Sequence, residues 1–462
     1  MTISVVILAA GEGKRMRSRL PKVLHDIGGQ PLLVHAIATA RQLGDASIHV
    51  VYGHGGDQVI AKLDAVLPPN SVRWVKQEQQ QGTGHAVAQA LPGIDESSTV
   101  LVLYGDVPLI SAATLRRLVA ASADGALALM TVELDNPAGY GRIVRDKAHA
   151  VTRIVEEKDA NDSQRAIREI NTGFLAVRAG QLRQWVERLD NSNAQREFYL
   201  TDVIAMAVQD GVAIRTVSPA SPFEVLGVND KAQLALLERY YQKMRAEELL
   251  KNGVTLRDPA RFDLRGEISY GTDVTIDVNV IIEGTVRLGS RVTIGPNVLL
   301  SNVEIGDDVE ILANCVIEDA VIGAGCRIGP FARVRPQTRL ADDVHVGNFV
   351  EIKKSTVASG SKINHLSYIG DSTVGARVNI GAGTITCNYD GANKYQTIIG
   401  DDVFVGSDSQ LVAPVRIGDG ATIGAGSTIT RDAPAGELTL SRAPQQTHPG
   451  WKKPVKKRRV EE

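Results

Sequence analysis

The stretch VTIDVNVIIEGTVRLGSRVTIGPNVLL, residues 274–300, carries an aliphatic residue at every sixth position. The repeating positions are Val274, Val280, Val286, Val292 and Val298, and an isoleucine or leucine follows each of them two residues later. Residues two apart point to the same side of a β-strand, so each pair marks one short strand with two side chains in a core. About three such strands would close a triangular coil, and the stretch therefore predicts a left-handed parallel β-helix built from hexapeptide repeats.

The repeat extends through much of the C-terminal part of the chain, and we expect the β-helix over about residues 254–437. It returns at Val403, Ser409, Val415, Ala421 and Ser427. The six-residue spacing breaks between Asn388 and Lys394, where we expect an inserted loop. Loops on a rigid scaffold often carry function, so this break marks a candidate site.

The N-terminal part of the chain has a different organisation. Residues 1–229 alternate apolar runs with helical segments, a pattern typical of an α/β doubly wound sheet. Buried parallel strands are predicted at residues 4–10, 48–52, 99–104 and 127–132, with helices at 31–43 and 83–90. This part forms the first predicted domain.

One amphipathic helix is predicted between the two parts, over residues 230–252. Asn229 or Asp230 would cap its start, and Asn252–Gly253 would end it. We expect an apolar stripe formed by Leu234, Leu237, Tyr241 and Met244. The chain is thus divided into residues 1–229, a linker helix 230–252, and a β-helix domain 253–462 with a basic C-terminal tail.

Composition narrows the class of protein. A formal net charge of −2 gives no general attraction to nucleic acid or to acidic membranes. No signal peptide is expected, and no apolar run is long enough for a membrane span. The three cysteines provide no paired framework and suit a reducing compartment. We therefore expect a cytoplasmic protein with small-molecule substrates and with neither nucleic-acid nor membrane partners.

A glycine-rich loop, GEGKRM at residues 11–16, follows the first predicted strand. Glycines free backbone N–H groups to surround a phosphate, and Lys14 and Arg15 add positive charge. The loop fits neither common phosphate motif. Met16 stands where a dinucleotide fingerprint needs glycine, and Arg15 stands where a Walker A loop needs Ser or Thr.

This loop belongs to a longer pattern. The run LAAGEGKRM at residues 8–16, followed by Pro21-Lys22, resembles the signature of sugar-nucleotide pyrophosphorylases. With the β-helix attached, and with GAGTITCNYD at residues 381–390, the whole chain resembles the bifunctional uridylyltransferase–acetyltransferases of that group. The resemblance implies acetyl transfer from acetyl-CoA to glucosamine 1-phosphate. It also implies transfer of UMP from UTP to N-acetylglucosamine 1-phosphate, with release of pyrophosphate.

The chemistry of nucleotidyl transfer suits the residues of the first domain. Several negative oxygens meet in this reaction, so catalysis needs positioning and charge neutralisation. Arg15 and Lys22 are the candidate catalytic residues, and Asp106 at a strand end suits Mg²⁺. By resemblance Asn229 is the second magnesium ligand, and UTP or the sugar nucleotide is bound by Leu8, Ala9, Ala10, Gly11, Lys22, Gln77, Gly82, Thr83, Tyr104, Gly105, Asp106, Gly141, Glu156, Asn171 and Asn229.

The β-helix carries polar residues that its core does not need. Acyl transfer to an amine needs a base, and His365 is the candidate, with Glu351 expected to orient its ring. By resemblance the acceptor is bound by Arg335, Lys353, Tyr368 and Asn379. The same resemblance assigns acetyl-CoA to Ala382, Asn388, Tyr389, Ser407, Ala425 and Arg442, and implies a homotrimer formed through the β-helix.

Three other interpretations remain open at this point. The β-helix of a sugar nucleotidyltransferase can be regulatory or oligomerising without being catalytic. A zinc hydratase on the same scaffold would need three His ligands, whereas the repeats offer His345 and His365, with His448 in the tail. The third is a structural or interaction protein.

Overall fold

The computed structural model describes residues 2–456. Its contacts separate two compact units. The first ends at Glu247 and also takes in Leu264–Gly266, and the second contains the remaining residues from Glu248 onward. The division falls inside the long helix α8 (Lys231–Lys251).

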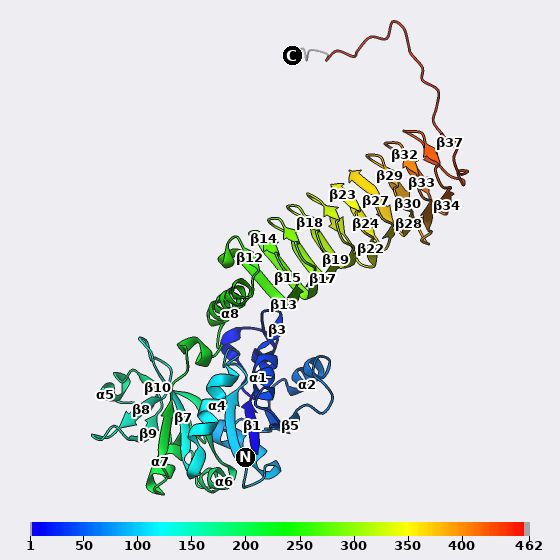
Figure 1. Ribbon diagram of the computed structural model, residues 1–462. Coiled ribbons are helices and arrows are strands. Elements are labelled where there is room, and N and C mark those ends of the chain that lie inside the picture. The colour runs from blue at the N-terminus through cyan, green and yellow to red at the C-terminus, as the bar shows by residue number, and fades with distance from the viewer. Residues whose placement is uncertain (1, 457–462) are drawn as a thin grey trace, which may run out of the picture. The chain divides into compact units, whose positions relative to one another are not determined.

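The first unit is built on one mixed sheet with the order β11-β7-β10-β6-β1-β4-β5. Strands β1, β5, β7 and β10 of this sheet are labelled in Figure 1. Its strands are β1 (Ile3–Leu8), β4 (Ser47–Tyr52), β5 (Arg73–Lys76), β6 (Thr99–Tyr104), β7 (Leu127–Glu133), β10 (Glu169–Arg178) and β11 (Ile214–Val217). The pairs along this order are parallel, except that β10 runs antiparallel to both of its neighbours. The predicted doubly wound sheet is therefore confirmed, with one reversed strand that the sequence did not indicate.

Helices cover both faces of this sheet. Apolar residues of α1 (Leu32–Arg41), α2 (Gly56–Asp64) and α4 (Ala112–Ala121) form one core with one face. Apolar residues of α3 (Thr83–Ala90), α6 (Ala179–Val186) and α7 (Asp202–Gln209) form a second core with the other face. The smaller elements are β2 (Asp26–Ile27), β3 (Gln30–Pro31), β8 (Arg142–Arg145), β9 (Val151–Val155) and α5 (Asp162–Arg165).

Helix α8 begins with the predicted cap. The Asp230 carboxylate accepts a hydrogen bond of 2.9 Å from the backbone N–H of Gln233. The predicted apolar stripe is only partly correct, because Leu237 is buried whereas Met244 is 44% exposed. A buried polar residue, Gln242, instead exchanges hydrogen bonds of 3.0 and 2.7 Å with the backbone of Leu264.

The second unit is a β-helix whose first face is a parallel sheet of short strands (Figure 1). In order they are β12 (Thr255–Leu256), β14 (Thr275–Ile276), β16 (Thr293–Ile294), β18 (Glu310–Ile311), β20 (Arg327–Ile328), β23 (His345–Asn348), β26 (Lys362–His365), β29 (Asn379–Ile380), β32 (Phe404–Val405), β35 (Thr422–Ile423) and β37 (Leu438–Thr439). Each strand from β12 to β35 directs one aliphatic side chain inward, so these side chains stack from coil to coil as the repeat predicted, whereas Leu438 of the last strand, β37, is exposed.

The other two faces form one continuous 15-stranded sheet, because the long strands β15 (Val280–Leu288), β17 (Leu299–Ile305) and β19 (Val316–Ile322) run round a corner. The remaining strands are β13 (Phe262–Tyr270), β21 (Arg333–Val334), β22 (Thr338–Leu340), β24 (Glu351–Lys353), β25 (Thr356–Val357), β27 (Tyr368–Gly370), β28 (Ser372–Val374), β30 (Ile385–Cys387), β31 (Thr397–Ile399), β33 (Gln410–Val412), β34 (Val415–Ile417) and β36 (Thr428–Ile429).

The predicted break in the repeat is a short loop between β30 and β31. Tyr389 and Lys394 form an isolated antiparallel bridge at its base. The Asp390 carboxylate accepts hydrogen bonds of 2.8 and 2.7 Å from the backbone N–H groups of Ala392 and Asn393. The loop therefore has its own internal order. Within residues 2–456, no helix has the length and apolar character of a membrane span.

Candidate active sites

The glycine-rich loop lies at the carboxyl end of β1, where its backbone packs against the segment that carries Lys22. Gly13 has a left-handed φ of 66°. A Cβ atom at Gly13 would lie 2.7 Å from Lys22 Cβ, so only glycine allows the two segments to approach this closely. Close packing here places the loop amides and Lys22 at one site.

A cavity of about 600 Å³ opens beside this loop. Its lining includes ten of the residues expected to bind nucleotide: Leu8, Ala9, Ala10, Gly11, Lys22, Gln77, Gly82, Thr83, Tyr104 and Asp106. Gln77 is buried in the wall, where its side-chain nitrogen lies 3.2 Å from the Gly82 carbonyl oxygen and 3.0 Å from His85 Nδ1. The cavity thus brings the phosphate loop and the predicted base-reading residues together.

Lys22 links two oxygen donors from distant parts of the sequence. Its ammonium group donates to Asp106 Oδ2 and lies 3.4 Å from Asn229 Oδ1. The Lys22 and Asp106 side chains are only 14% and 15% exposed. A carboxylate oxygen and an amide oxygen therefore converge on one positive charge, which is the donor set that Mg²⁺ prefers.

A backbone contact holds these two donors together. The N–H of Val228 donates to the carbonyl oxygen of Asp106 at 2.9 Å, which joins the end of β6 to the segment before α8. Asn229 itself donates its N–H to the side-chain oxygen of Gln233 at 2.7 Å. The residues thus fit a magnesium site with few protein ligands, although Asp106 and Asn229 lie far apart in the sequence.

Three residues expected to bind the sugar also lie close together. The N–H of Asn171 donates to the Gly141 carbonyl oxygen at 2.8 Å, and a Cβ atom at Gly141 would lie 3.4 Å from the Glu156 carboxylate. Burial raises the pKa of Glu156, while a hydrogen bond from Thr201 Oγ1 at 3.0 Å opposes that shift. Burial, with the charges of Glu156 and Asp106, raises the pKa of Tyr104. Tyr104 therefore lies near two carboxylates, that of Asp106, the predicted metal ligand, and that of Glu156, predicted to bind the sugar.

Two expected residues have less direct positions. Arg15 is exposed in a short turn of 3₁₀ helix, Lys14–Met16, and does not line the cavity. Gly105 contributes backbone only, through a hydrogen bond of 2.9 Å from its N–H to the Leu8 carbonyl oxygen. Sequence reasoning also missed lining residues, including Gln80 and Glu197. Glu197 lies in an irregular segment without a motif, so no local signal indicated it.

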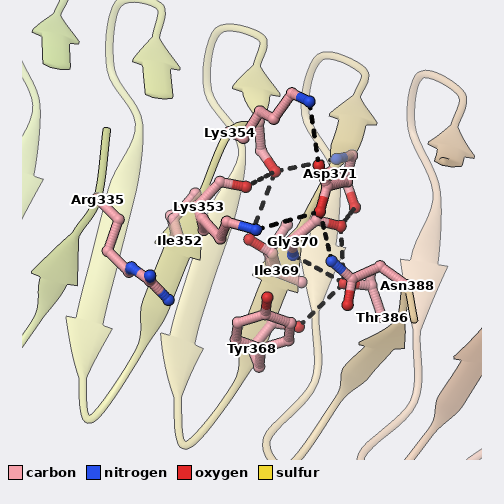
Figure 2. Close-up of polar contacts among 12 residues, drawn as sticks. Arg335, Ile352, Lys353, Lys354, Tyr368, Ile369, Gly370, Asp371, Thr386 and Asn388 are labelled. Carbon is pink, nitrogen blue, oxygen red and sulfur yellow. Dashed lines mark hydrogen bonds and ion pairs between the residues drawn. The ribbon is translucent and has the colours of Figure 1, made fainter. Parts of the chain in front are cut away.

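On the β-helix, Arg335, Lys353 and Tyr368 gather on one face, on successive coils (Figure 2). Arg335 donates to Glu351 Oε1 at 2.7 Å, and Lys353 Nζ lies 3.5 Å from Asp371 Oδ2. Asn379 lies in β29, which belongs to the first face. The expected acceptor-binding residues are therefore divided between two sheets of the chain.

His365 ends β26, at the corner between these two sheets, and is exposed. Its Nδ1 lies 3.0 Å from Asn348 Oδ1. The expectation that Glu351 orients this ring is wrong, because Glu351 pairs with Arg335. A neutral ring that donates from Nδ1 to this amide oxygen leaves on Nε2 the lone pair that a general base needs.

Three residues expected to contact acetyl-CoA form a column that starts at His365. The His365 carbonyl oxygen accepts a hydrogen bond from the Gly383 N–H at 3.3 Å. On the next coil, the Ala382 carbonyl oxygen accepts from the Asp408 N–H at 2.7 Å. On the coil after that, the Ser407 carbonyl oxygen accepts from the Gly426 N–H at 2.8 Å. Arg442 donates to the carbonyl oxygen of Ala425 at 2.8 Å. At about 4.8 Å per coil, this column runs about 14 Å from His365 to Ala425. Asn388 and Tyr389 come from the inserted loop.

Comparison with known proteins extends these observations to the whole chain. Family models match residues 5–172 (MobA-like NTP transferase domain), 264–350 (GMPPB C-terminal domain) and 396–431 (bacterial transferase hexapeptide, six repeats). The chain is 59% identical over 460 residues to the bifunctional protein GlmU of Methylococcus capsulatus, covering 99% of both chains. The GlmU of Azoarcus sp. is 58% identical over 456 residues, covering 99% of this chain and 100% of that one.

The chain belongs to the GlmU family.

Membership in GlmU confirms the predicted bifunctional transferase, with nucleotidyltransferase and hexapeptide acyltransferase parts in one chain. These matches also decide against a sugar nucleotidyltransferase whose β-helix is only regulatory or oligomerising, and against a structural or interaction protein. A solved structure of UDP-glucose pyrophosphorylase complexed with UDP-glucose aligns with a TM-score of 0.44 and 17% identity, over 53% of this chain and 100% of that chain. Among residues 2–456, no three His, Cys, Asp or Glu side chains are grouped to hold a metal such as zinc.

Proposed function

We propose that the β-helix transfers acetyl from acetyl-CoA to glucosamine 1-phosphate, and that the first unit then transfers UMP from UTP to the product. The observation that supports this most directly is the exposed His365. Asn348 holds its Nδ1, and the cations Arg335 and Lys353 lie on the adjoining face. A purely structural prism needs neither a free imidazole nitrogen nor a group of cations.

In the proposed acetyl transfer, His365 Nε2 accepts a proton from the amine of glucosamine 1-phosphate as the amine attacks the thioester carbonyl. The new C–N bond forms, the C–S bond breaks, and the CoA thiolate leaves and is protonated. Arg335 and Lys353 bind the acceptor phosphate, Tyr368 and Asn379 bind its sugar, and the column from Ala382 to Arg442 binds the donor. The step requires no protein thiol, because the amine attacks the thioester directly, and burial raises the pKa of Cys387.

In the proposed uridylyl transfer, a phosphate oxygen of N-acetylglucosamine 1-phosphate attacks the α-phosphorus of UTP, and pyrophosphate leaves. Lys22, Arg15 and the amides of the glycine-rich loop neutralise and position the phosphates. Mg²⁺, held by Asp106 and Asn229, would supply further neutralisation of phosphate charge. Gln77, Gly82 and Thr83 read the uracil, while Gly141, Glu156 and Asn171 hold the sugar.

We also propose that three copies of the chain associate through the β-helix. A column of apolar residues, Phe331, Phe349 and Leu366, is 49%, 56% and 62% exposed on successive coils next to His365. The two phenylalanine rings stack with centroids 5.3 Å apart. Exposed stacked aromatics of this kind mark an interface. A second copy packed there would complete a site whose members are divided between two faces of one chain.

The test is product analysis by mass spectrometry with glucosamine 1-phosphate, acetyl-CoA, UTP and Mg²⁺. We expect UDP-N-acetylglucosamine, with N-acetylglucosamine 1-phosphate as its precursor. His365→Ala should slow CoA release at least about a hundredfold. The same variant should still form the sugar nucleotide when N-acetylglucosamine 1-phosphate is supplied. His345→Ala, on the neighbouring strand, is the matched control and should retain both activities. Wild-type protein that releases no CoA would reject the acetyltransferase assignment.

A further inference from the structure

A corner of the β-helix beside the acetyltransferase site holds a buried carboxylate, that of Asp371. The residue follows β27 with a left-handed φ of 48°. Its side chain is only 9% exposed, whereas carboxylates are rarely buried unless they have partners. Figure 2 shows Lys353, Lys354 and Asn388 directed toward it. Asp371 is not one of the substrate-binding residues proposed above.

Asp371 is held from several sides. Its Oδ2 accepts a hydrogen bond of 2.5 Å from Asn388 Nδ2 and lies 3.5 Å from Lys353 Nζ, while its Oδ1 lies 3.6 Å from Lys354 Nζ. Its backbone N–H donates to the carbonyl oxygen of Lys353 at 3.0 Å, and its own carbonyl oxygen accepts from Thr397 at 3.3 Å. The carboxylate is therefore fixed between one proposed acceptor-binding residue and one proposed donor-binding residue.

We propose that Asp371 is a positioning residue for acetyl transfer, which fixes Lys353 Nζ and the Asn388 amide and so couples the acceptor and donor halves of the site. This inference rests on the proposed acetyltransferase function. Asp371 itself does not bind the acceptor phosphate, because the two groups carry like charges. Its effect on the substrate passes through its two neighbours.

The chemistry of each neighbour explains why a carboxylate is needed. A carboxylate only accepts hydrogen bonds, so Asn388 turns its NH₂ group toward Asp371 and presents its amide oxygen on the other side. Lys353 shares its surroundings with Lys354 and Lys394, and the contact with Lys353 together with its positive charge lowers the pKa of Lys394. An anion among these cations reduces their mutual repulsion and keeps Lys353 directed toward a phosphate.

The experiment measures acetyl-transfer kinetics of the full-length Asp371→Asn variant. Asn tolerates left-handed backbone, so the replacement removes the charge with little strain. We expect kcat/KM for glucosamine 1-phosphate to fall by about tenfold or more, as is typical for loss of a hydrogen bond to a charged group. Uridylyl transfer should be unchanged. In a Lys353→Met background, the same replacement should cost no more than about threefold, because coupled residues are not additive.

Asp319→Asn is the matched control. Asp319 also has left-handed backbone (φ 43°), and its Oδ1 accepts from Asn302 Nδ2 at 3.1 Å, away from the proposed site. It should keep wild-type kinetics. If Asp371→Asn does not fold, Asp371→Gly removes the carboxylate at a backbone angle that glycine prefers, and the same kinetic loss is expected. Unchanged acceptor kinetics, or a loss fully additive with Lys353→Met, would overturn the proposal. Absence of CoA release by wild-type protein would instead reject the underlying function.

Discussion

The positive charge of Lys22 neutralises the Asp106 carboxylate, because the ammonium group lies between Asp106 and Asn229. A divalent cation at the proposed magnesium site would compete with Lys22 for the same two oxygens. Lys22→Met should therefore bind Mn²⁺ about tenfold more tightly than wild type in the absence of nucleotide, since a nearby positive charge is removed from a mostly buried place. Electron paramagnetic resonance of free Mn²⁺ measures this directly. Lys62→Met, on the surface of α2, is the control, and equal or weaker binding by Lys22→Met would contradict the assignment.

Glu156, which is proposed to bind the sugar, lowers the stability of the folded protein at neutral pH because its carboxylate is buried. Burial raises its pKa above the ordinary value of 4.5, so the folded protein holds the proton more tightly than the unfolded chain does. The contribution of this group to stability is therefore greatest at low pH and is lost as pH rises through the folded-state pKa. Glu156→Gln should melt at a higher temperature than wild type at pH 7, and the difference should shrink toward pH 4. Calorimetry across this range checks the trend, and uridylyl transfer should fall about tenfold or more.

Among the elements, β10 best illustrates how a local irregularity forms a site. Its register with β7 shifts between Asn171 and Leu175, and Gly173 there has a φ of 86°. A Cβ atom at Gly173 would lie 2.4 Å from the Tyr104 ring. Gly173→Ala should displace Tyr104 and Asn171, and we expect uridylyl transfer to fall about tenfold or more while acetyl transfer is unchanged. Gly211→Ala, also at positive φ but with open space around it, is the control for backbone strain. Equal effects of the two variants would contradict this explanation.

The elements also show what the sequence could and could not predict. A continuous apolar run predicted β6 with its correct bounds, and the helical segment at residues 83–90 predicted α3 with its correct bounds. The six-residue repeat predicted the β-helix, and all three signals are local. The antiparallel β10 was missed, since its central Asn-Thr-Gly interrupts any apolar run. Asn348 and Thr201 were missed for a different reason. Asn348 contacts His365, and Thr201 donates to Glu156. The fold brings each pair together, and no motif in the sequence indicates the pairing.

At the scale of the whole molecule, the exposed column of Phe331, Phe349 and Leu366 gives a prediction about association. Phe349→Ser removes the central ring, and we expect a trimer to become a monomer in analytical ultracentrifugation at micromolar concentration. Acetyl transfer should fall with the trimer, whereas uridylyl transfer should remain. Val66→Ser replaces an exposed apolar residue of the first unit and should leave the mass unchanged. A wild-type monomer with full acetyltransferase activity would show that one chain is sufficient.

The column from His365 to Arg442 has a consequence for the evolution of donor choice. The proposed base, His365, and the far end of the column, where Arg442 contacts Ala425, are joined by stacked coils of the same β-helix, so their separation along its axis is a whole number of coils. Inserting one further coil between β29 and β32 would lengthen the column proposed to bind the donor by about 4.8 Å without changing any existing coil. The number of coils would then set the length of the acyl carrier that fits, and new carriers would become accessible through duplication of one coil, which is about three hexapeptide repeats.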